Sequence, residues 1–244
     1  MLKITNISII FPIYNEERRI KISLNNNSKF IAKHKFKKIE IILVDDGSND
    51  QTENNIKFFL KKLMNNNIKY IKLNKNCGKG YALKKGVLTA KYDWVLTCDI
   101  DLSVDLKQIY NWNNFFFKKK NSKIFFGSRS IKGAIVKKSL VRAFLGSFFN
   151  FFLKFILKIN INDTQCGFKL YTNKIAKKIF NKIKFYGYIH DVEIALICRN
   201  LNINIIELPV IWNHKSHGKL NLLIDPILMF LDILKLRIVY KKLF

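Results

Sequence analysis

The sequence predicts an α/β domain whose mainly parallel sheet is flanked by helices. Across the first half of the chain, apolar runs of strand length alternate with amphipathic stretches of helix length. The first run, residues 7–12, is nearly continuous, as in a strand that is buried on both faces. With 244 residues, of which 49% are hydrophobic and 14% aromatic, the chain can bury the core that such a domain needs.

The expected elements follow one another in a regular order. Strands are predicted at residues 7–12, 39–44, 68–73, 94–98 and 123–127. Helices are predicted between the first four strands, at residues 16–34, 49–64 and 80–89. Because each crossover has the length of a helix, the strands should run parallel, and such sheets bind ligands beyond the carboxyl ends of their strands. The polar clusters at those ends form the candidate site.

Two apolar segments distinguish the second half of the chain. Residues 139–159 and 222–244 are rich in aliphatic and aromatic side chains, yet both contain lysine and arginine. Since about 20 uncharged apolar residues are needed to span a bilayer, and charges near a helix centre are costly, spanning segments are not expected. We expect two amphipathic helices on an anionic membrane surface, the first inserted in a domain of residues 1–221 and the second following it. Packing of both helices on the domain or on a partner subunit is the alternative.

The chain is strongly basic, with 44 Lys and Arg against 17 Asp and Glu and a formal net charge of +27. Such a charge attracts nucleic acids, lipid headgroups or phosphorylated substrates, although a general bias toward Lys, Asn and Ile explains it equally well. The basic residues are scattered, which argues against a nucleic-acid-binding module. Four cysteines without a CxxC pair predict neither a zinc site nor a disulfide framework, and Pro12 interrupts the first apolar stretch, which predicts a strand and not a signal peptide.

The most informative motif is Asp99-Ile100-Asp101, directly after the predicted strand 94–98. Two carboxylates one residue apart at a strand end can hold a hard divalent cation, which neutralises charge on a departing diphosphate. Isolated motifs of this kind also occur by chance in surface loops. The position after the fourth parallel strand favours a Mg²⁺ or Mn²⁺ site at Asp99 and Asp101.

Two further motifs follow earlier strands. Asp45 and Asp46 come at a strand end, where a carboxylate can accept hydrogen bonds from a base or a ribose; capping of the next helix is the alternative. Residues 76–80, Asn-Cys-Gly-Lys-Gly, place glycines and Lys79 ahead of a helix, an arrangement that binds phosphate. No Ser or Thr follows Lys79, so an ATPase P-loop is not supported.

Arg129 follows the predicted strand 123–127, and its planar guanidinium can clamp a phosphate with two hydrogen bonds. A surface salt bridge is the alternative. A phosphate monoester is already charged and nucleophilic at neutral pH, so a phosphate acceptor needs no strong protein base. If the acceptor were a hydroxyl, Asp191 would be the candidate general base.

The chain carries, in order, the motifs FPIYNE (11–16), VDDGSND (44–50), NCGKG (76–80), DID (99–101), GSRS (127–130) and DTQCGFKLY (163–171). Together they resemble the inverting glycosyltransferases of family 2, which have a Rossmann-like GT-A fold. DTQCGFKLY and the later motifs HDVE (190–193) and GKLN (218–221) resemble those of the dolichyl-phosphate, or polyprenyl-phosphate, glucosyltransferase branch and its mannosyltransferase relatives. Those mannosyltransferases often carry Gln where this chain has Ser103, which leaves the third metal ligand open and favours the glucosyl branch.

The resemblance implies a role for each matching residue. Residues expected around the nucleotide and the donor diphosphate are Pro12, Tyr14, Glu16, Asp45, Asp46, Lys79 and the metal ligands Asp99 and Asp101. Residues expected around the acceptor phosphate, the sugar and the reacting centre are Arg129, Arg142, Asp163, Gln165, Asp191 and Glu193. Lys219 would approach the diphosphate from a closing loop.

The resemblance also implies a reaction. A hexose, expected to be glucose, would pass from a nucleotide diphosphate-sugar such as UDP-glucose to a polyprenyl phosphate at the cytoplasmic face of a membrane. Asp101, Arg129 and Asp191 would be the catalytic residues. The alternative is a family 2 enzyme that acts on a sugar hydroxyl in cell-surface polysaccharide synthesis.

Overall fold

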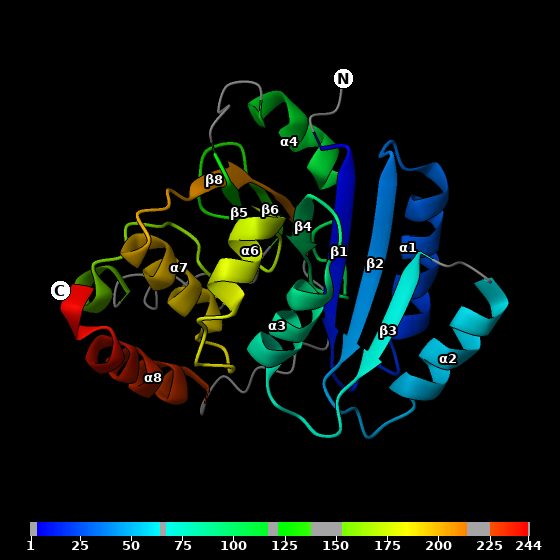
Figure 1. The fold of residues 1–244 in the computed structure, drawn as a ribbon, viewed down its shortest axis with the longest axis horizontal. Coiled ribbons are helices and arrows are strands. Elements are labelled where there is room, and N and C mark those ends of the chain that lie inside the picture. The colour runs from blue at the N-terminus through cyan, green and yellow to red at the C-terminus, as the bar shows by residue number, and fades with distance from the viewer. Residues whose placement is uncertain (1–3, 64–66, 117–121, 138–152, 214–224, 244) are drawn as a thin grey trace.

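The computed structural model describes residues 4–63, 67–116, 122–137, 153–213 and 225–243 (Figure 1). Within these residues, seven strands form one twisted sheet in the order β3-β2-β1-β4-β7-β5-β8. Their bounds are β1 (Asn6–Ile13), β2 (Lys38–Asp45), β3 (Ile68–Lys72), β4 (Trp94–Thr97), β5 (Ile124–Ser128), β7 (Lys169–Thr172) and β8 (Ile206–Pro209). The sheet therefore contains every strand that the sequence predicts, together with two that it does not.

The sheet is parallel except at one strand. β1 pairs in parallel with β2 and β4, and β2 pairs in parallel with β3. β7 is antiparallel to both β4 and β5, while β5 and β8 are parallel to each other. The prediction of a mainly parallel sheet is confirmed, and β7 is the strand that joins its two parallel parts.

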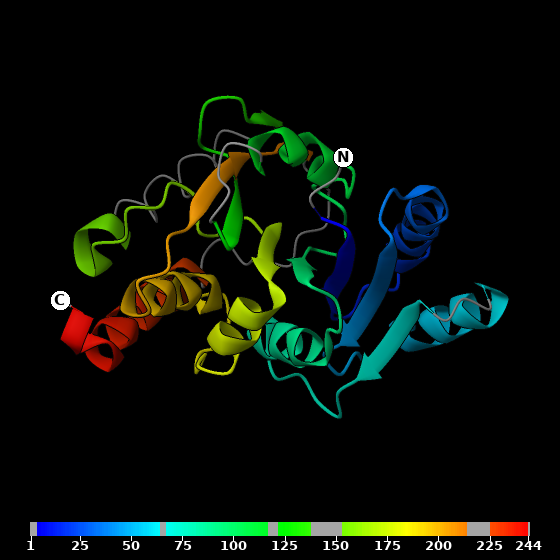
Figure 2. The same ribbon diagram turned by 45° about the horizontal axis from the view of Figure 1, so that its top comes forward.

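Helices cover both faces of the sheet, as the views in Figures 1 and 2 show. One face carries α1 (Ile20–Lys33), α2 (Thr52–Leu63) and α4 (Gln108–Phe116), and its core includes Leu24, Ile56 and Trp112. The other face carries α3 (Lys79–Thr89), α6 (Asn173–Phe180) and α7 (His190–Asn200), with a core that includes Leu83, Ile179 and Ile197. Both faces are closed, which accounts for the nearly continuous apolar runs in the central strands.

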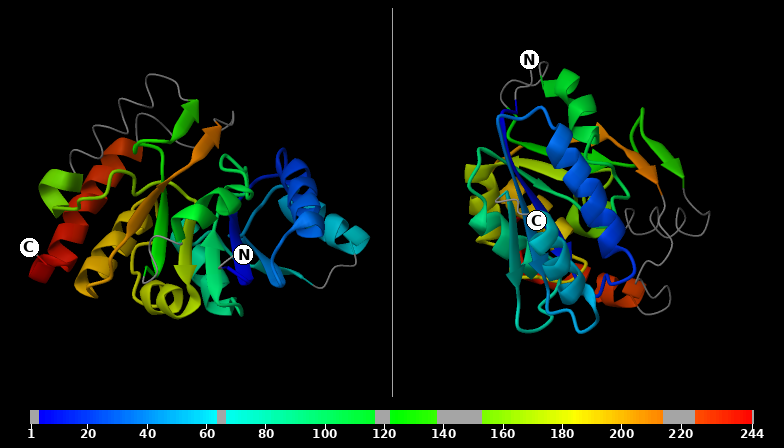
Figure 3. Two further views of the ribbon diagram at one scale, coloured as in Figure 1. Left: turned by 90° about the horizontal axis from the view of Figure 1, so that it is seen from above. Right: turned by 90° about the vertical axis from the view of Figure 1, so that its right-hand side faces the viewer.

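A third apolar cluster lies at the end of the molecule opposite α2 (Figure 3). It joins the helical residues 153–157 and α7 to the C-terminal helix α8 (Asp225–Val239), and it includes Leu157, Leu196 and Leu236. The 3₁₀ helix η1 (Lys241–Leu243) follows α8. A small separate sheet pairs β6 (Ile135–Lys137) with β9 (Ile211–Asn213) in parallel.

Three expectations about segments can be compared with these elements. The helix expected from residue 16 begins at Ile20, because residues 14–19 form a turn in which the Arg19 and Ile20 amides donate to the Glu16 carbonyl. Of the expected helix 139–159, residues 139–152 lie outside the described residues, and so do Arg142 and Lys219. No helix in the described part of the chain has the length and hydropathy needed to cross a bilayer.

Candidate active site

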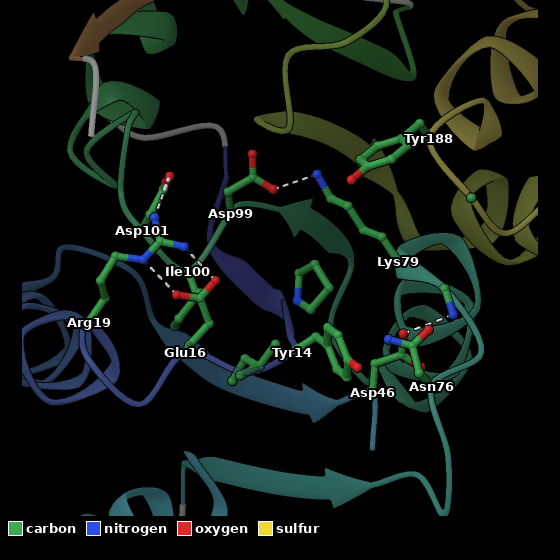
Figure 4. Close-up of a pocket in the computed structure, with 14 residues that line it drawn as sticks. Tyr14, Glu16, Arg19, Asp46, Asn76, Lys79, Asp99, Ile100, Asp101 and Tyr188 are labelled. Carbon is green, nitrogen blue, oxygen red and sulfur yellow. Dashed lines mark hydrogen bonds and ion pairs between the residues drawn. The ribbon is translucent and has the colours of Figure 1, made fainter. Parts of the chain in front are cut away.

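A cavity of about 590 Å³ lies beyond the carboxyl ends of β1, β2 and β4 (Figure 4). Its lining comes from residues 12 and 13 at the end of β1, from residues 14, 16 and 19 after β1, from Asp46 after β2, and from residues 99–101 after β4. Residues 76 and 78 precede α3 and residue 79 begins it, and residues 187 and 188 precede α7. The structure thus brings four of the sequence motifs to one place, as the parallel topology predicts.

Asp46 organises the glycine-lysine loop. Its two carboxylate oxygens accept hydrogen bonds from the amides of Cys77 and Gly78, each at 2.8 Å. Gly78 has φ +97°, and a Cβ there would lie 2.5 Å from the carbonyl oxygen of Tyr186, so no other residue fits. Burial raises the pKa of Asp46 and outweighs these two bonds. The loop in this way presents the N-terminus of α3, which favours anions, to the cavity.

Asp45 lies one layer deeper. Its side chain is fully buried, accepts hydrogen bonds from the Ser48 amide at 2.9 Å and the Tyr70 hydroxyl at 2.8 Å, and is not among the lining residues. Burial and the bond to Asp45 raise the pKa of Tyr70. Asp45 therefore supports the turn at Gly47, whose φ is +71°, while its neighbour Asp46 faces the cavity.

Asp99 and Lys79 form an ion pair across the cavity, with Nζ 2.6 Å from Oδ1 (Figure 4). Burial opposes both charges, but the pair outweighs it, so the pKa of Asp99 is lowered and that of Lys79 is raised. Gly167, from the segment before β7, packs directly on Asp99, since a Cβ there would lie 2.4 Å from Oδ2. The position of Asp99 therefore depends on a glycine far along the chain.

Asp101 is held by its own turn and by α1. The Ser103 amide donates to its Oδ1 at 2.9 Å, and Leu102 between them has φ +53°, a conformation that costs a non-glycine residue energy. Arg19 Nη1 lies 3.8 Å from the other oxygen, while Nε and Nη2 of Arg19 bind both oxygens of Glu16 at 2.7 and 2.6 Å. Burial opposes the charge of Arg19, but Glu16, Asp101 and Asp99 raise its pKa.

The donor set at this end of the cavity suits a divalent cation. The side chains of Asp99 and Asp101 are 41% and 22% exposed, and both line the cavity. Hard cations such as Mg²⁺ prefer carboxylate oxygens and keep further positions for water or phosphate oxygens. No cluster of three or more metal-ligating side chains occurs in the described ranges.

Arg129 is bound by a carboxylate from the predicted sugar pocket. Its amide and Nε donate to Asp163 Oδ2 at 2.9 and 2.7 Å, and Nη2 donates to Oδ1 at 2.8 Å. The Gln165 amide donates to the same carboxylate at 3.1 Å, and Trp212 lies beside the guanidinium. The pair lowers the pKa of Asp163 against the effect of its burial. None of these side chains lines the cavity, so this cluster stands apart from the four converging motifs.

Asp191 is buried at the start of α7. Lys169 Nζ lies 2.6 Å from its Oδ1 and also donates to the Cys166 carbonyl at 2.7 Å, and His190 Nε2 lies 3.4 Å from the same Oδ1. Burial opposes the charge of Asp191, but the cations Lys169 and Lys79 lower its pKa. Burial lowers the pKa of His190, so its ring is neutral. Asp191 is thus a buried, ionised carboxylate that does not line the cavity.

Glu193, expected near the reacting centre, faces away from it. The carboxylate is fully buried and accepts hydrogen bonds from the Lys184 and Phe185 amides and from the Tyr240 hydroxyl. Three residues at or behind the cavity had no role predicted from the sequence: Arg19, Lys169 and Tyr188. Arg19 had a detectable signal, since it follows Glu16 by three residues, the spacing of an ion pair on a helical turn.

Comparison with known proteins places these features in a family. Residues 8–180 match Glycosyl transferase family 2. The chain is 34% identical to the dolichyl-phosphate beta-glucosyltransferase of Dictyostelium discoideum over 243 residues, which cover 96% of this chain and 74% of that protein. It is 32% identical to the enzyme of that name from Saccharomyces cerevisiae, with 96% and 75% covered, and 30% identical to the human one, with 88% and 69% covered.

Solved structures show the same fold at lower identity. Glucosyl-3-phosphoglycerate synthase from Mycobacterium tuberculosis, in complex with UDP, has a TM-score of 0.66 at 15% identity, with 95% of this chain and 80% of that chain covered. The same enzyme with Mn²⁺, UDP-glucose and phosphoglyceric acid has a TM-score of 0.63 at 14% identity, with 97% and 79% covered. The GT-A fold that the motifs imply is confirmed. Since the family match extends over well more than half of the chain, this protein belongs to glycosyl transferase family 2.

Proposed function

We propose that this glycosyltransferase moves glucose from UDP-glucose to a polyprenyl phosphate of the dolichyl type, with Mg²⁺ or Mn²⁺ held by Asp99 and Asp101. The observation that carries the proposal is the cavity in which these two carboxylates, Lys79 and the N-terminus of α3 meet. The relatives named dolichyl-phosphate beta-glucosyltransferase support the acceptor and the sugar. The related structure that contains Mn²⁺ and UDP-glucose supports the donor and the metal.

Different residues around the cavity would bind different parts of a nucleotide diphosphate-sugar. Lys79 and the helix N-terminus supply positive charge for the diphosphate. Tyr14, Glu16 and Asp46 line the cavity and are the proposed contacts of the nucleoside. When bound, the divalent cation neutralises charge on the departing diphosphate. Arg19 keeps Glu16 and Asp101 in place through its bonds to both.

The proposed reaction is a single displacement that inverts the anomeric carbon. An oxygen of the acceptor phosphate forms a bond to C1 of glucose while the bond from C1 to the diphosphate breaks, and its electron pair leaves with UDP. The acceptor carries about −1.5 to −2 charges at neutral pH, so no proton has to be removed. Arg129 is the proposed acceptor ligand, and Nη1 is the guanidinium nitrogen not used in its three bonds to Asp163.

The surroundings of Asp191 favour a phosphate over a sugar hydroxyl as acceptor. A general base must reach the proton that it removes, and its pKa works best near the operating pH. Asp191 is 5% exposed, is paired with Lys169, and has a lowered pKa, with burial working against that shift. These properties suit a fixed buried charge and not a proton acceptor. Arg142 and Lys219, outside the described residues, remain proposed phosphate ligands.

We also propose that the protein binds the cytoplasmic, anionic face of a membrane through α8 and residues 153–157. The apolar side chains Leu228, Leu231, Leu234 and Ile238 of α8 are 39% to 70% exposed, and Phe155 is 75% exposed. Lys154, Lys235, Lys241 and Lys242 provide exposed positive charge beside them. Apolar side chains flanked by cations are what an interfacial helix needs to bind anionic lipid.

The test is to incubate the protein with radiolabelled UDP-glucose and vesicles that contain dolichyl phosphate and Mn²⁺. We expect an acid-labile product that extracts into organic solvent, and we expect Asp101→Ala to abolish it. A product that forms only with a sugar-hydroxyl acceptor, and that is lost in Asp191→Asn, would support the alternative and overturn the proposal. The absence of any product from the wild-type protein with all nucleotide sugars would overturn both.

A further inference from the structure

The segment of residues 184–188, called here the wall segment, connects the cavity to the C-terminal helix. Its end, Gly187 and Tyr188, lines the cavity. Its middle contacts α3, because the Tyr186 carbonyl accepts the Gly80 amide at 2.8 Å and the Tyr186 ring packs edge-on against Tyr81. Its start, Lys184 and Phe185, is bound by Glu193. The wall segment therefore meets the cavity and the start of α3 at one end and a buried carboxylate at the other.

Glu193 joins the wall segment to the C-terminal end of α8. One oxygen accepts the Tyr240 hydroxyl at 2.7 Å, and the carboxylate accepts the Lys184 amide at 3.0 Å and the Phe185 amide at 2.9 Å. Glu193 is fully buried, which raises its pKa, while the hydrogen bonds from Phe185, Tyr240 and Lys184 oppose that shift. Hydrogen bonds to a buried carboxylate are stronger than neutral ones, and losing one leaves a costly unsatisfied charge.

The C-terminal helix is itself fixed to the same body. Ile233 and Leu236 of α8 are buried against α7 in the third apolar cluster. Arg237 Nη1 donates to the Ile156 carbonyl at 2.6 Å, and Arg199 of α7 donates to the carbonyls of Leu157 and Leu243. Movement of α8 would consequently displace Tyr240, then Glu193, and then the wall segment.

We propose that the Tyr240–Glu193 hydrogen bond couples the packing of α8 against α7, called here the seating of α8, to the shape of the nucleotide-sugar cavity. The inference rests on the proposed function, since it assigns a regulatory role to the helix that would bind the membrane. When α8 is seated, Glu193 holds the Lys184 and Phe185 amides in place. The Tyr186 carbonyl then stays bound to the Gly80 amide, and this bond fixes the loop that carries Lys79. Coupling is reciprocal, so the nucleotide should also tighten the seating of α8.

Tyr240→Phe tests the coupling, because it removes one hydroxyl and leaves the ring in place. We expect the Kd for UDP with Mn²⁺, measured by calorimetry, and the KM for UDP-glucose to rise about fivefold or more, with little change in the KM for the acceptor. Tyr110→Phe is the control, since Tyr110 is also half-buried and lies away from the cavity, although its hydroxyl accepts a hydrogen bond from the Lys35 amide instead of donating one to a carboxylate. The control should keep wild-type values.

Hydrogen exchange gives a readout that needs no ligand. In Tyr240→Phe, the amides of Lys184, Phe185 and Gly80 should exchange about fivefold faster or more, while α1 and β2 keep wild-type protection. Glu193→Gln, which keeps the shape but loses the charge, should show the same pattern. Unchanged exchange at Gly80 together with faster exchange at Lys184 would overturn the coupling, whatever the ligand is. If the wild-type protein does not bind UDP but Tyr240→Phe still shows this exchange pattern, the result would count against the proposed function alone.

Discussion

The two halves of the sheet use charged residues in different ways. Around β1, β2 and β4, the acids Asp46, Asp99 and Asp101 follow strand ends and face the cavity. Around β5, β7 and β8, charged groups bind one another, as in the partly exposed Arg129–Asp163 pair and the buried Lys169–Asp191 pair. The comparison teaches that three acids of the first half face the cavity, whereas these charged pairs of the second half bind one another outside its lining.

The largest effect should come from a cavity carboxylate. Asp101→Asn keeps the shape and the bond from the Ser103 amide but removes the charge that a divalent cation needs. We expect glucosyl transfer to fall about 10³-fold, with little change in the thermal midpoint. An activity within a factor of ten of wild type, measured at saturating Mn²⁺, would break the comparison, because Asp101 would then be no more than a support for its turn.

The next effect concerns stability. Lys169→Met leaves Asp191 buried without its cation, and removing one partner of a buried pair costs about 3 to 5 kcal/mol. Urea unfolding should show this loss, and Asp191→Asn in the same chain should restore part of it. Lys57→Met, which removes one of the two exposed lysines paired with Glu53, is the control and should leave the urea midpoint unchanged. Equal midpoints for the two lysine variants would contradict the structural role of the second-half charges.

The pH dependence of stability should sharpen the contrast. Burial lowers the pKa of His190 although Asp191 opposes it, so on acidification the unfolded chain takes up a proton that the folded chain does not. The free energy of unfolding is therefore highest above about pH 6.5, the pKa of an unfolded histidine. Below that pH it falls with a slope of up to about 1.4 kcal/mol per pH unit. His190→Asn can still donate to the Gly187 carbonyl but does not titrate. Its free energy of unfolding should change less than that of wild type between pH 7 and pH 5.5; identical slopes would count against a neutral His190.

The smallest effect lies in the core of the first half. Asn27 on α1 is 1% exposed, and neither of its side-chain polar atoms has a hydrogen-bond partner among the described residues. Asn27→Leu removes these unsatisfied groups and should stabilise the protein by about 1 kcal/mol. Asn26→Leu lies on the exposed side of the same helix and measures the gain from helix propensity alone. Its change in the free energy of unfolding should be subtracted from that of Asn27→Leu. A larger gain for Asn26→Leu would show that Asn27 is satisfied in solution.

The first half could be predicted well from sequence because its signals are local. An apolar run followed by acids predicts both a strand and the strand end at which polar residues gather. β4 and the cavity residue Asp99 could therefore be predicted together. The partners of the second half are not local. Arg129 binds a carboxylate 34 residues away, and β7 is a four-residue strand whose neighbours no local pattern specifies.

The expectation that Glu193 lies beside Asp191 conflicts with helix geometry, which could have been applied to the sequence. Residues two apart on a helix point to opposite sides, so Asp191 and Glu193 of α7 do not face one site. Asp191 faces Lys169 behind the cavity, and Glu193 faces Lys184 and Tyr240. The resemblance suggested a common location for the motif, and helix geometry separates its two acids.

The place of β7 between β4 and β5 has a consequence for synthesis on the ribosome. When β5 has emerged, β4 still has an open edge, because the strand that separates the two has not been made. The intervening residues 129–168 take roughly 2 to 8 s to translate at about 5 to 20 residues per second. During that interval the nascent chain exposes an unpaired apolar strand, the kind of edge that mispairs and recruits chaperones.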